Sequence, residues 1–268
     1  MPVSTEIKIT PLSQTEFSKV AYGVMEEIFF LHRELGRLFN EKVYNHALSA
    51  RLSNVYSEVK IAVSFKDFCK NYYMDAVASN GAVFEFKTSE AIHARHRSQL
   101  LNYLLLTELR HGKLVNLRPE TVEHEFVNTT LSLADRTSFS IDDSRWHSTL
   151  GFGTAEKYLV IEILREWGSC LDIALYEEAL VHFFGGSELV LGNVDVILDG
   201  AHVSKQLISF CAPRIAFKLT MFDHDAASYR KDLARFIQRT QLQAIQWINI
   251  GRRQLRFETI NQTSGRNV

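Results

Sequence analysis

The chain has 268 residues, 46% hydrophobic and 23% charged, which is the composition of an ordinary globular protein and excludes disordered and low-complexity classes. Its length predicts about two domains. Thirty Lys and Arg against 31 Asp and Glu exclude nucleic-acid binding by bulk positive charge, but not a local basic patch. The chain starts with a polar segment, has no long apolar stretch, and its three cysteines form no CxxC pair. These features predict a cytoplasmic protein with no membrane partner.

Hydrophobic periodicity in the first half predicts helices, then strands, then a helix and further strands. Gly36 and Asn40 are expected to divide the first helical segment in two. The order of these elements is typical of an α/β layered domain. The expected elements are helical residues 17–52, strands 59–65, 72–78 and 82–87, a helix over 89–110, and strands 114–117 and 125–127.

The second half follows the same plan. Residues 43–48 resemble 175–180, and residues 84–87 resemble 215–218. We interpret this as an internal duplication, with domains at 1–142 and 143–268 that meet in a polar stretch. Two unrelated α/β domains with similar patterning are the alternative. The expected elements are helical residues 155–184, strands 189–198, 206–211 and 215–219, a helix over 229–242, and strands 244–250 and 255–260.

The register of the hairpin around residues 79–81 decides whether two acidic side chains meet. A two-residue turn at Asn80-Gly81 would send Asp75 and Glu85 to opposite faces. A three-residue loop, with Gly81 in the left-handed position, pairs Asp75 with Glu85 and is favoured by glycine at its last position. Strand alternation then places Lys87 on the same face. Two adjacent carboxylates favour a hard cation such as Mg²⁺ between them.

Several motifs in this region resemble those of the GxxExxY proteins, a branch of the PD-(D/E)XK nuclease superfamily. They are Glu41-x-x-Tyr44, the hairpin with Asp75 and Glu85-x-Lys87, His96-x-x-Gln99-Leu100-Leu101-Asn102-Tyr103-Leu104, and Gly112-x-Leu114-Val115-Asn116. The resemblance covers roughly residues 17–127. It departs from the motif at one point, because Leu38 stands where the family has glycine. It implies a tandem pair of restriction-endonuclease-like α/β/α domains, each a mixed central sheet flanked by helices.

The resemblance also implies roles for individual residues. Asp75, Glu85 and the carbonyl of Phe86 would hold Mg²⁺ or Mn²⁺, and Lys87 would position the attacking water. Glu41 would complete the metal site or hold a bound water. The remaining candidates lie on the following helix, where Gln99 would orient Lys87 or a phosphate oxygen and the substrate contacts would be His96, Arg95 and Arg97.

The second copy lacks this set of residues. When it is aligned on Lys218, Glu85 corresponds to Ala216 and Asp75 to Ser209. By the same comparison Ile173 stands for Glu41 and Asp232 for Gln99, so only the lysine survives. The predicted helix over 229–242 carries Lys231, Arg235 and Arg239 at intervals of four, either a phosphate-binding stripe or an ordinary solvated face.

These observations predict a divalent-metal-dependent nuclease, endo- or exonucleolytic, that hydrolyses phosphodiester bonds of DNA in preference to RNA by attack of a metal-activated water. The alternative is a non-catalytic module that binds nucleic acid or protein and retains the nuclease fold. The second copy would replace a homodimer partner and make the monomer a pseudo-dimer, unless the protein is itself a homodimer.

Overall fold

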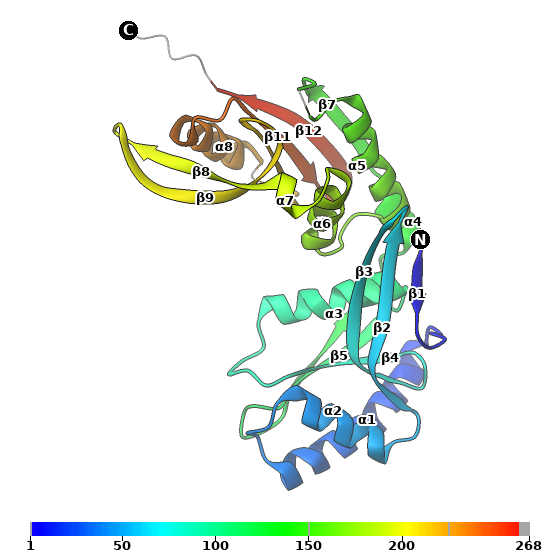
Figure 1. Ribbon diagram of the computed structural model, residues 1–268. Helices are drawn as coiled ribbons and strands as arrows, with labels where there is room; N and C mark the ends of the chain where they lie inside the picture. Colours follow the sequence, from blue (N-terminus) through cyan, green and yellow to red (C-terminus); the bar gives the residue numbers. More distant parts are fainter. Residues whose placement is uncertain (1, 150, 225, 263–268) are drawn as a thin grey trace. The chain divides into compact units, whose positions relative to one another are not determined.

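The computed structural model describes residues 2–149, 151–224 and 226–262, which form two compact units, Met1–Leu133 and Ala134–Val268. Over these described ranges each unit contains one six-stranded mixed sheet with helices packed against it (Figure 1). The fold is thus mixed α/β with two flanked sheets, consistent with the predicted tandem of restriction-endonuclease-like domains. No helix in the described ranges is long and apolar enough to cross a membrane.

In the first unit the strands follow the sheet in chain order, β1 to β6. β4 and β5 are parallel and all other neighbours are antiparallel, because α3 makes the crossover between them. The elements are β1 (Val3–Thr5), α1 (Gln14–Leu35), α2 (Glu41–Arg51), β2 (Val55–Phe65), β3 (Phe68–Ala78), β4 (Ala82–Lys87), α3 (Ala94–Thr107), β5 (His111–Asn116) and β6 (Glu123–Asn128).

The predicted division of the first helical segment is confirmed. α1 ends at Gly36, whose φ of 74° is a conformation that glycine tolerates best, and its N–H bonds back to His32. Asn40 caps α2 by accepting a hydrogen bond from the N–H of Val43. The break turns the chain so that both helices pack on the same face of the sheet.

The two faces of β4 meet different helices. Phe84 and Phe86 are buried in a cluster with residues of α1 and α2. On the other face Gly112 lies so close to α3 that an added Cβ would come within 2.9 Å of the Leu100 side chain. Since successive strand residues alternate, Glu85 and Lys87 lie on the α3 face of this sheet.

In the second unit the sheet order is β7-β12-β11-β10-β9-β8. β10 and β11 are parallel with α8 between them, and β7 joins β12 in parallel. The elements are α4 (Leu133–Thr137), β7 (Ser140–Arg145), α5 (Thr154–Trp167), α6 (Ile173–Phe183), α7 (Ser187–Val190), β8 (Leu191–Leu198), β9 (Ala201–Ala212), β10 (Ile215–Thr220), α8 (Ala226–Thr240), β11 (Ala244–Ile250) and β12 (Gln254–Asn261).

Five strands of each sheet are therefore connected in the same way. β2 to β6 correspond to β8 to β12, with two long helices before the first strand and one helix inside the parallel crossover. The second unit adds the 4-residue α7 directly before β8. The sixth strand differs, because β1 pairs with β2 at one edge whereas β7 pairs with β12 at the opposite edge.

The structure differs from the sequence-based expectation at the unit boundary. The division falls between Leu133 and Ala134, not between residues 142 and 143. β7 already belongs to the second sheet, and the buried Arg136 donates hydrogen bonds to the carbonyls of Trp167 and Ser169. β1 and β7 were not predicted because short, polar edge strands carry little hydrophobic alternation.

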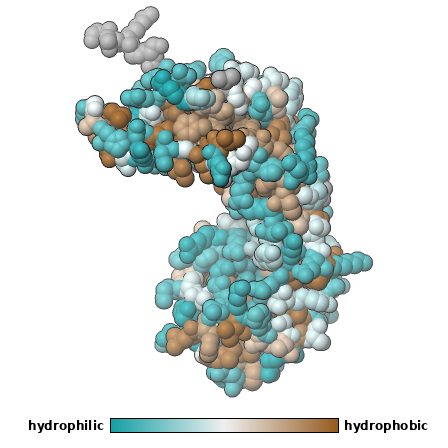
Figure 2. Space-filling model, viewed as in Figure 1, coloured by the Kyte–Doolittle hydropathy of each residue, from teal (hydrophilic) through white to brown (hydrophobic). Residues whose placement is uncertain are grey.

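A second difference concerns the helical segment 155–184. It forms two helices, because Gly168 ends α5 with a φ of 78° and Asp172 caps α6. Around this break Trp167 and Tyr176 are fully buried. Brown, apolar side chains gather on the visible face of the second unit in Figure 2. The exposed large hydrophobic residues of this unit include Leu189, Leu191, Leu198, Val203 and Leu207.

Candidate active site

The register of the β3–β4 hairpin is the one that brings the two carboxylates together. Ala78 pairs with Ala82 and Ala76 with Phe84, so residues 79–81 form a three-residue loop. Asp75 and Glu85 occupy the next positions along the two strands. The prediction of a three-residue loop is confirmed.

The expected role of Gly81 in this loop is wrong. The left-handed residues are Ser79 (φ 48°) and Asn80 (φ 59°). Gly81 is needed for a different reason, since a Cβ there would lie 2.2 Å from the carbonyl oxygen of Thr10. The N-terminal segment therefore crosses directly over the turn, and Thr10 donates its N–H to the Asn80 carbonyl at 2.8 Å.

Asp75 lies where the two strands begin to separate. One of its oxygens, Oδ2, accepts the Phe86 N–H at 2.8 Å, and so takes the place of a backbone acceptor. Burial raises the pKa of Asp75 above its ordinary value, and the hydrogen bond from Phe86 opposes this only in part. Oδ1 of Asp75 is left for another partner.

Glu85 and Lys87 form a buried ion pair on the α3 face. Their side chains are 1% and 12% exposed, and Lys87 Nζ donates to Glu85 Oε1 at 2.7 Å. Burial, and then the charge of Asp75, raise the pKa of Glu85 to about 8. Burial opposes the charge on Lys87, but the adjacent Glu85 carboxylate outweighs it and raises the pKa of the lysine. Oε2 of Glu85 is buried without a hydrogen-bond partner.

Glu41 reaches the same place from α2. It is the first residue of that helix, and its Oε1 accepts the N–H of Thr88 just beyond β4 at 2.9 Å. Its charge is among the causes of the shifted pKa values of Asp75, Glu85 and Lys87. Three carboxylates and one ammonium are thus electrostatically linked in this unit.

This donor set fits a hard divalent cation. Each of the three carboxylates keeps one oxygen without a hydrogen bond in the described part of the chain, and an unpartnered buried oxygen such as Glu85 Oε2 is costly unless a ligand satisfies it. The side chain of Phe86 is buried in the core, so this residue can contribute only its carbonyl. The described residues contain no group of three His, Cys, Asp or Glu side chains converged as metal ligands. Glu85 is instead paired with Lys87.

Among the predicted α3 residues, His96 is linked to the site by charge, since Lys87 and Glu41 both affect its pKa. It is 5% exposed, and its Nδ1 accepts the N–H of His93 at 3.2 Å. Burial, followed by the charges of Lys87 and Arg95, lowers its pKa and so favours the uncharged ring.

The other three α3 candidates make contacts of their own. Arg97 forms a two-pronged ion pair with Glu125 of β6, with the shorter contact at 2.5 Å. Arg95 Nε lies 3.2 Å from Nε2 of His96. Gln99 donates to the hydroxyl of Tyr103 at 3.0 Å and makes no hydrogen bond to Lys87 within the described residues. The Arg97 guanidinium is therefore already paired within this unit.

The sequence-based site omits Asn45, which the structure places beside Asp75. Its Nδ2 donates to the Asp75 carbonyl at 2.5 Å, and its Oδ1 is buried without a partner. Asn45 follows Glu41 by four residues and so shares its helix face, a spacing from which it can be identified. The contact fixes α2 to β3 at the residue that carries the carboxylate.

Glu58 on β2 is a second omission. It lies opposite Asp75, between the pairs Ser57–Ala76 and Val59–Met74, and has a φ of 53° inside a strand. Its charge contributes to the raised pKa of Asp75. A left-handed residue other than glycine inside a strand is backbone strain of the kind found near functional sites, but it leaves no sequence pattern.

The second unit has a different chemistry at the corresponding positions. The parallel pair Lys87–Asn116 corresponds to Thr220–Asn249, since Asn116 and Asn249 bind the chain beyond β4 and β10 in the same way. Lys218 therefore stands at the position of Glu85, not at that of Lys87 as the sequence alignment predicts.

The same register places Ile208 at the Asp75 position, not Ser209. The hydroxyl of Thr220 is buried, accepts the indole N–H of Trp247 at 2.8 Å and donates to Asn249. Lys218 is half exposed and pairs with Glu177 at 3.4 Å. The described positions that correspond to the three carboxylates Asp75, Glu85 and Glu41 carry none in this unit. The Trp247 indole lies against Thr220, at the lysine position.

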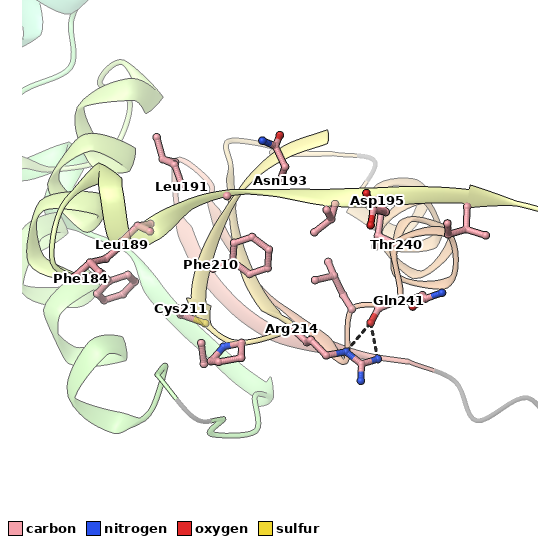
Figure 3. Close-up of a pocket in the computed structure, with 17 residues that line it drawn as sticks. Phe184, Leu189, Leu191, Asn193, Asp195, Phe210, Cys211, Arg214, Thr240 and Gln241 are labelled. Atoms are coloured by element: carbon pink, nitrogen blue, oxygen red, sulfur yellow. Dashed lines mark hydrogen bonds between the residues drawn. The ribbon is translucent and has the colours of Figure 1, made fainter. Parts of the chain in front are cut away.

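A hollow lies in the second unit, whereas the carboxylates belong to the first. It is a groove of about 740 Å³ in the second unit, beneath β8 and beside α7 and the end of α8 (Figure 3). Leu189, Leu191 and Phe210 line it, and the side chain of Arg214 is held by the Gln241 carbonyl. The groove carries no cluster of acids and bases, so its size does not make it the reaction site.

Comparison with known proteins bears on the first unit. A crystal structure titled "Crystal structure of SSO0001" matches with 21% identity and a TM-score of 0.28, over 45% of this chain and 60% of that chain. No curated protein matches the chain. Residues 18–128 match the model of the PD-(D/E)XK nuclease superfamily, whose members are typically metal-dependent hydrolytic nucleases, and this stretch contains every site residue described above.

Proposed function

We propose that the first unit is a divalent-metal-dependent nuclease that hydrolyses phosphodiester bonds of DNA. The observation that carries the proposal is the buried Glu85, paired with Lys87 through one oxygen and unsatisfied at the other, next to Asp75 on the neighbouring strand. A structural ion pair needs no second carboxylate and no orphaned oxygen. The superfamily match over residues 18–128 supports the same interpretation.

The metal would be held by Asp75, Glu85 and the Phe86 carbonyl, with Glu41 binding it directly or through water. A bound Mg²⁺ or Mn²⁺ supplies Lewis-acid activation of water and of the phosphate. Lys87 donates from its ammonium to the attacking water or to a non-bridging phosphate oxygen, where negative charge accumulates. The water oxygen would then bond to phosphorus and release a proton to solvent, the opposite P–O bond would break, and the leaving oxygen would take a proton from solvent.

The other residues fix this arrangement. Asn45 holds the backbone of Asp75, and the Thr88 N–H holds Glu41. His96 is buried on the α3 side of the site, where burial and the charge of Lys87 lower its pKa. Arg95 and Arg97 are exposed on the same helix and would contact the phosphate backbone, and Gln99 would support Lys87 or a phosphate oxygen.

The direct test is cleavage of supercoiled and linear DNA by the full chain with Mg²⁺, Mn²⁺ or EDTA. We expect metal-dependent cleavage that Glu85→Gln abolishes. Metal binding without turnover, measured by calorimetry with Mn²⁺, would contradict the enzymatic part of the proposal. An RNA substrate of matched sequence separates the two nucleic acids, since we expect the DNA to be cut faster.

One observation favours the alternative, a binding module that retains the fold. Lys87 forms an ion pair with Glu85 at 2.7 Å. Among the described residues no three His, Cys, Asp or Glu side chains are grouped so that they could hold a metal ion. If this pair persists with metal present, Glu85→Gln and Lys87→Ala will alter stability alone, and nucleic acid will still bind.

We further propose that the first unit belongs to the GxxExxY branch and that the two units arose by duplication. Leu38 replaces the motif glycine, but the carbonyl of the nearby Gly36 accepts the Tyr44 hydroxyl. Tyr176 donates to the Gly168 carbonyl in the same way, at 2.6 Å. A monomer would then be a pseudo-dimer, and light scattering at several concentrations tests this, since a concentration-independent dimer contradicts it.

A further inference from the structure

Charge is separated within the second unit and mixed within the first. Residues 134–199 carry four Lys and Arg against twelve Asp and Glu, whereas residues 200–268 carry eleven against four. In the first unit residues 1–66 carry eight against seven, and residues 67–133 seven against eight. The helices α5 and α6 therefore belong to an acidic part of the second unit, and α8 to a basic part.

α8 concentrates this basic charge on its outer face. Its inward face, with Leu233 and Ile237, packs on the sheet in one hydrophobic cluster. Lys231, Arg235 and Arg239 are exposed and follow one another at intervals of four, which places them along one line of the helix. We call these three residues the α8 stripe. At 1.5 Å per residue the stripe is about 12 Å long.

The cations of the α8 stripe are free to bind a ligand. Arg235 contacts Asp232 at 3.0 Å, but both side chains are well exposed, and such a pair contributes only about 0–1 kcal/mol. Lys231 and Arg239 form no ion pair within the described part of the chain. Arg230, which precedes Lys231, is paired with the buried Glu258 and does not belong to the stripe.

The corresponding face of α3 shows that exposure here is specific to the second unit. Ser98, Asn102 and Leu106 occupy the equivalent positions, and the last two are buried. Leu106 lines a small cavity together with Val3 and Thr5 of β1. The second unit has its sixth strand at the other edge of the sheet, so no described strand of that unit covers this face of α8.

We propose that the α8 stripe binds the phosphate backbone of duplex DNA. A linear row of exposed cations about 12 Å long, of which only Arg235 has a partner among the described residues and that partner is itself exposed, matches a regular row of phosphates. A membrane surface fits less well, because an interfacial helix must bury its apolar face in lipid, and that face of α8 is already packed on the sheet. The choice of DNA as the polyanion rests on the proposed function. The assignment of the α8 stripe as a polyanion-binding surface does not, because it follows from the exposed charges themselves.

Salt-dependent binding by the full chain tests this inference. Anisotropy of a fluorescent DNA duplex is titrated in EDTA, which prevents cleavage, at several salt concentrations. The variant Lys231→Gln/Arg235→Gln/Arg239→Gln is compared with Lys8→Gln/Lys19→Gln/Arg165→Gln, which changes the net charge equally at exposed residues outside α8. Circular dichroism and thermal midpoints verify that both fold.

We expect the α8 variant alone to bind more weakly, by at least tenfold, with a shallower dependence on salt. If all three side chains contact phosphates, the slope of log K against log salt falls by about 2.7, at roughly 0.9 per contact. Equal losses in both variants, or no loss in either, would overturn the proposal. So would a loss confined to an RNA duplex. Failure of the nuclease assay with α8-dependent binding retained would reject the catalytic proposal alone.

Discussion

The two units share the contacts that build the scaffold and differ in those that make the site. Tyr44 and Tyr176 each donate to the glycine that ends the preceding helix, and Asn116 and Asn249 each bind the chain beyond the parallel strand. Yet Asp75, Glu85 and Lys87 are matched by Ile208, Lys218 and Thr220. Scaffold contacts are therefore retained independently of chemistry, and a shared fold does not imply a shared activity.

The largest expected difference between the two units is in the rate of DNA cleavage after the lysine of β4 or the lysine of β10 is removed. Lys87→Ala should lower the rate of DNA cleavage about 10³-fold, as expected when a fixed group that stabilises transition-state charge is lost. Lys218→Ala should leave the rate unchanged, since its position corresponds to Glu85 and it pairs with Glu177 on the surface. Single-turnover cleavage measures both. Equal loss from both variants would show that the assigned register is wrong.

The two units should also differ in how their stability depends on pH. The folded-state pKa of Glu85, about 8, lies above its ordinary value of 4.5, so the folded chain binds this proton more tightly than the unfolded chain does. Stability of the first unit should fall as pH rises from about 4.5 to 8, by roughly 5 kcal/mol if the full shift is realised.

Glu85→Gln should remove most of this slope. Hydrogen exchange resolved by peptide, corrected for intrinsic rates, gives the stability of each unit at each pH. Peptides of the second unit are the internal reference, because the equivalent Lys218 is half exposed. A variant with an undiminished slope would mean that another group carries the pH dependence.

The turn of the β3–β4 hairpin should give a smaller change in the free energy of unfolding. Gly81→Ala would force a Cβ against the Thr10 carbonyl and Leu12, so we expect a loss of about 1–3 kcal/mol. Gly23→Ala is the matched control, because no atom lies within 4 Å of its added Cβ on the exposed side of α1. It should stabilise by about 0.5–1 kcal/mol. Urea unfolding followed by circular dichroism measures both, and changes of the same sign would contradict the close approach seen at Gly81.

The smallest expected effect tests the shared part of the scaffold. Tyr44→Phe and Tyr176→Phe each remove one hydrogen bond to a glycine carbonyl and should cost about 1 kcal/mol apiece. Hydrogen exchange at α1 and α5 reports the two losses separately. A loss in only one unit would show that the two contacts are not equivalent.

Sequence reasoning succeeds where a pattern is local. The helix break at Gly36, the three-residue loop after Ala78 and the strand that carries Glu85 and Lys87 all follow from spacing and turn chemistry. It fails where partners come from elsewhere. Gly81 is constrained by Thr10, far away in the sequence, and β1 and β7 exist because sheet edges need partners, not because their residues alternate.

The candidate site shows the same limit. Asp75, Glu85 and Lys87 can be identified from the sequence because one hairpin carries them all. The sequence alignment matches Lys218 with Lys87 because both are lysines at the end of an apolar strand, and it therefore places β10 two residues out of register. Only the pairing of β10 with β11 shows that Thr220 stands at the lysine position. The spacing to Glu41 can identify Asn45, but not its contact with the Asp75 carbonyl. The position of Glu58 opposite Asp75 depends on strand register, which no local pattern encodes.

The indole packed against Thr220 has a practical consequence. Trp247, like Trp146 and Trp167, lies in the second unit, and the first unit contains no tryptophan. Fluorescence excited at the red edge of the absorption band therefore originates from the second unit alone. Unfolding of the second unit can therefore be followed by its tryptophan fluorescence without an added dye, and the first unit does not contribute to that signal.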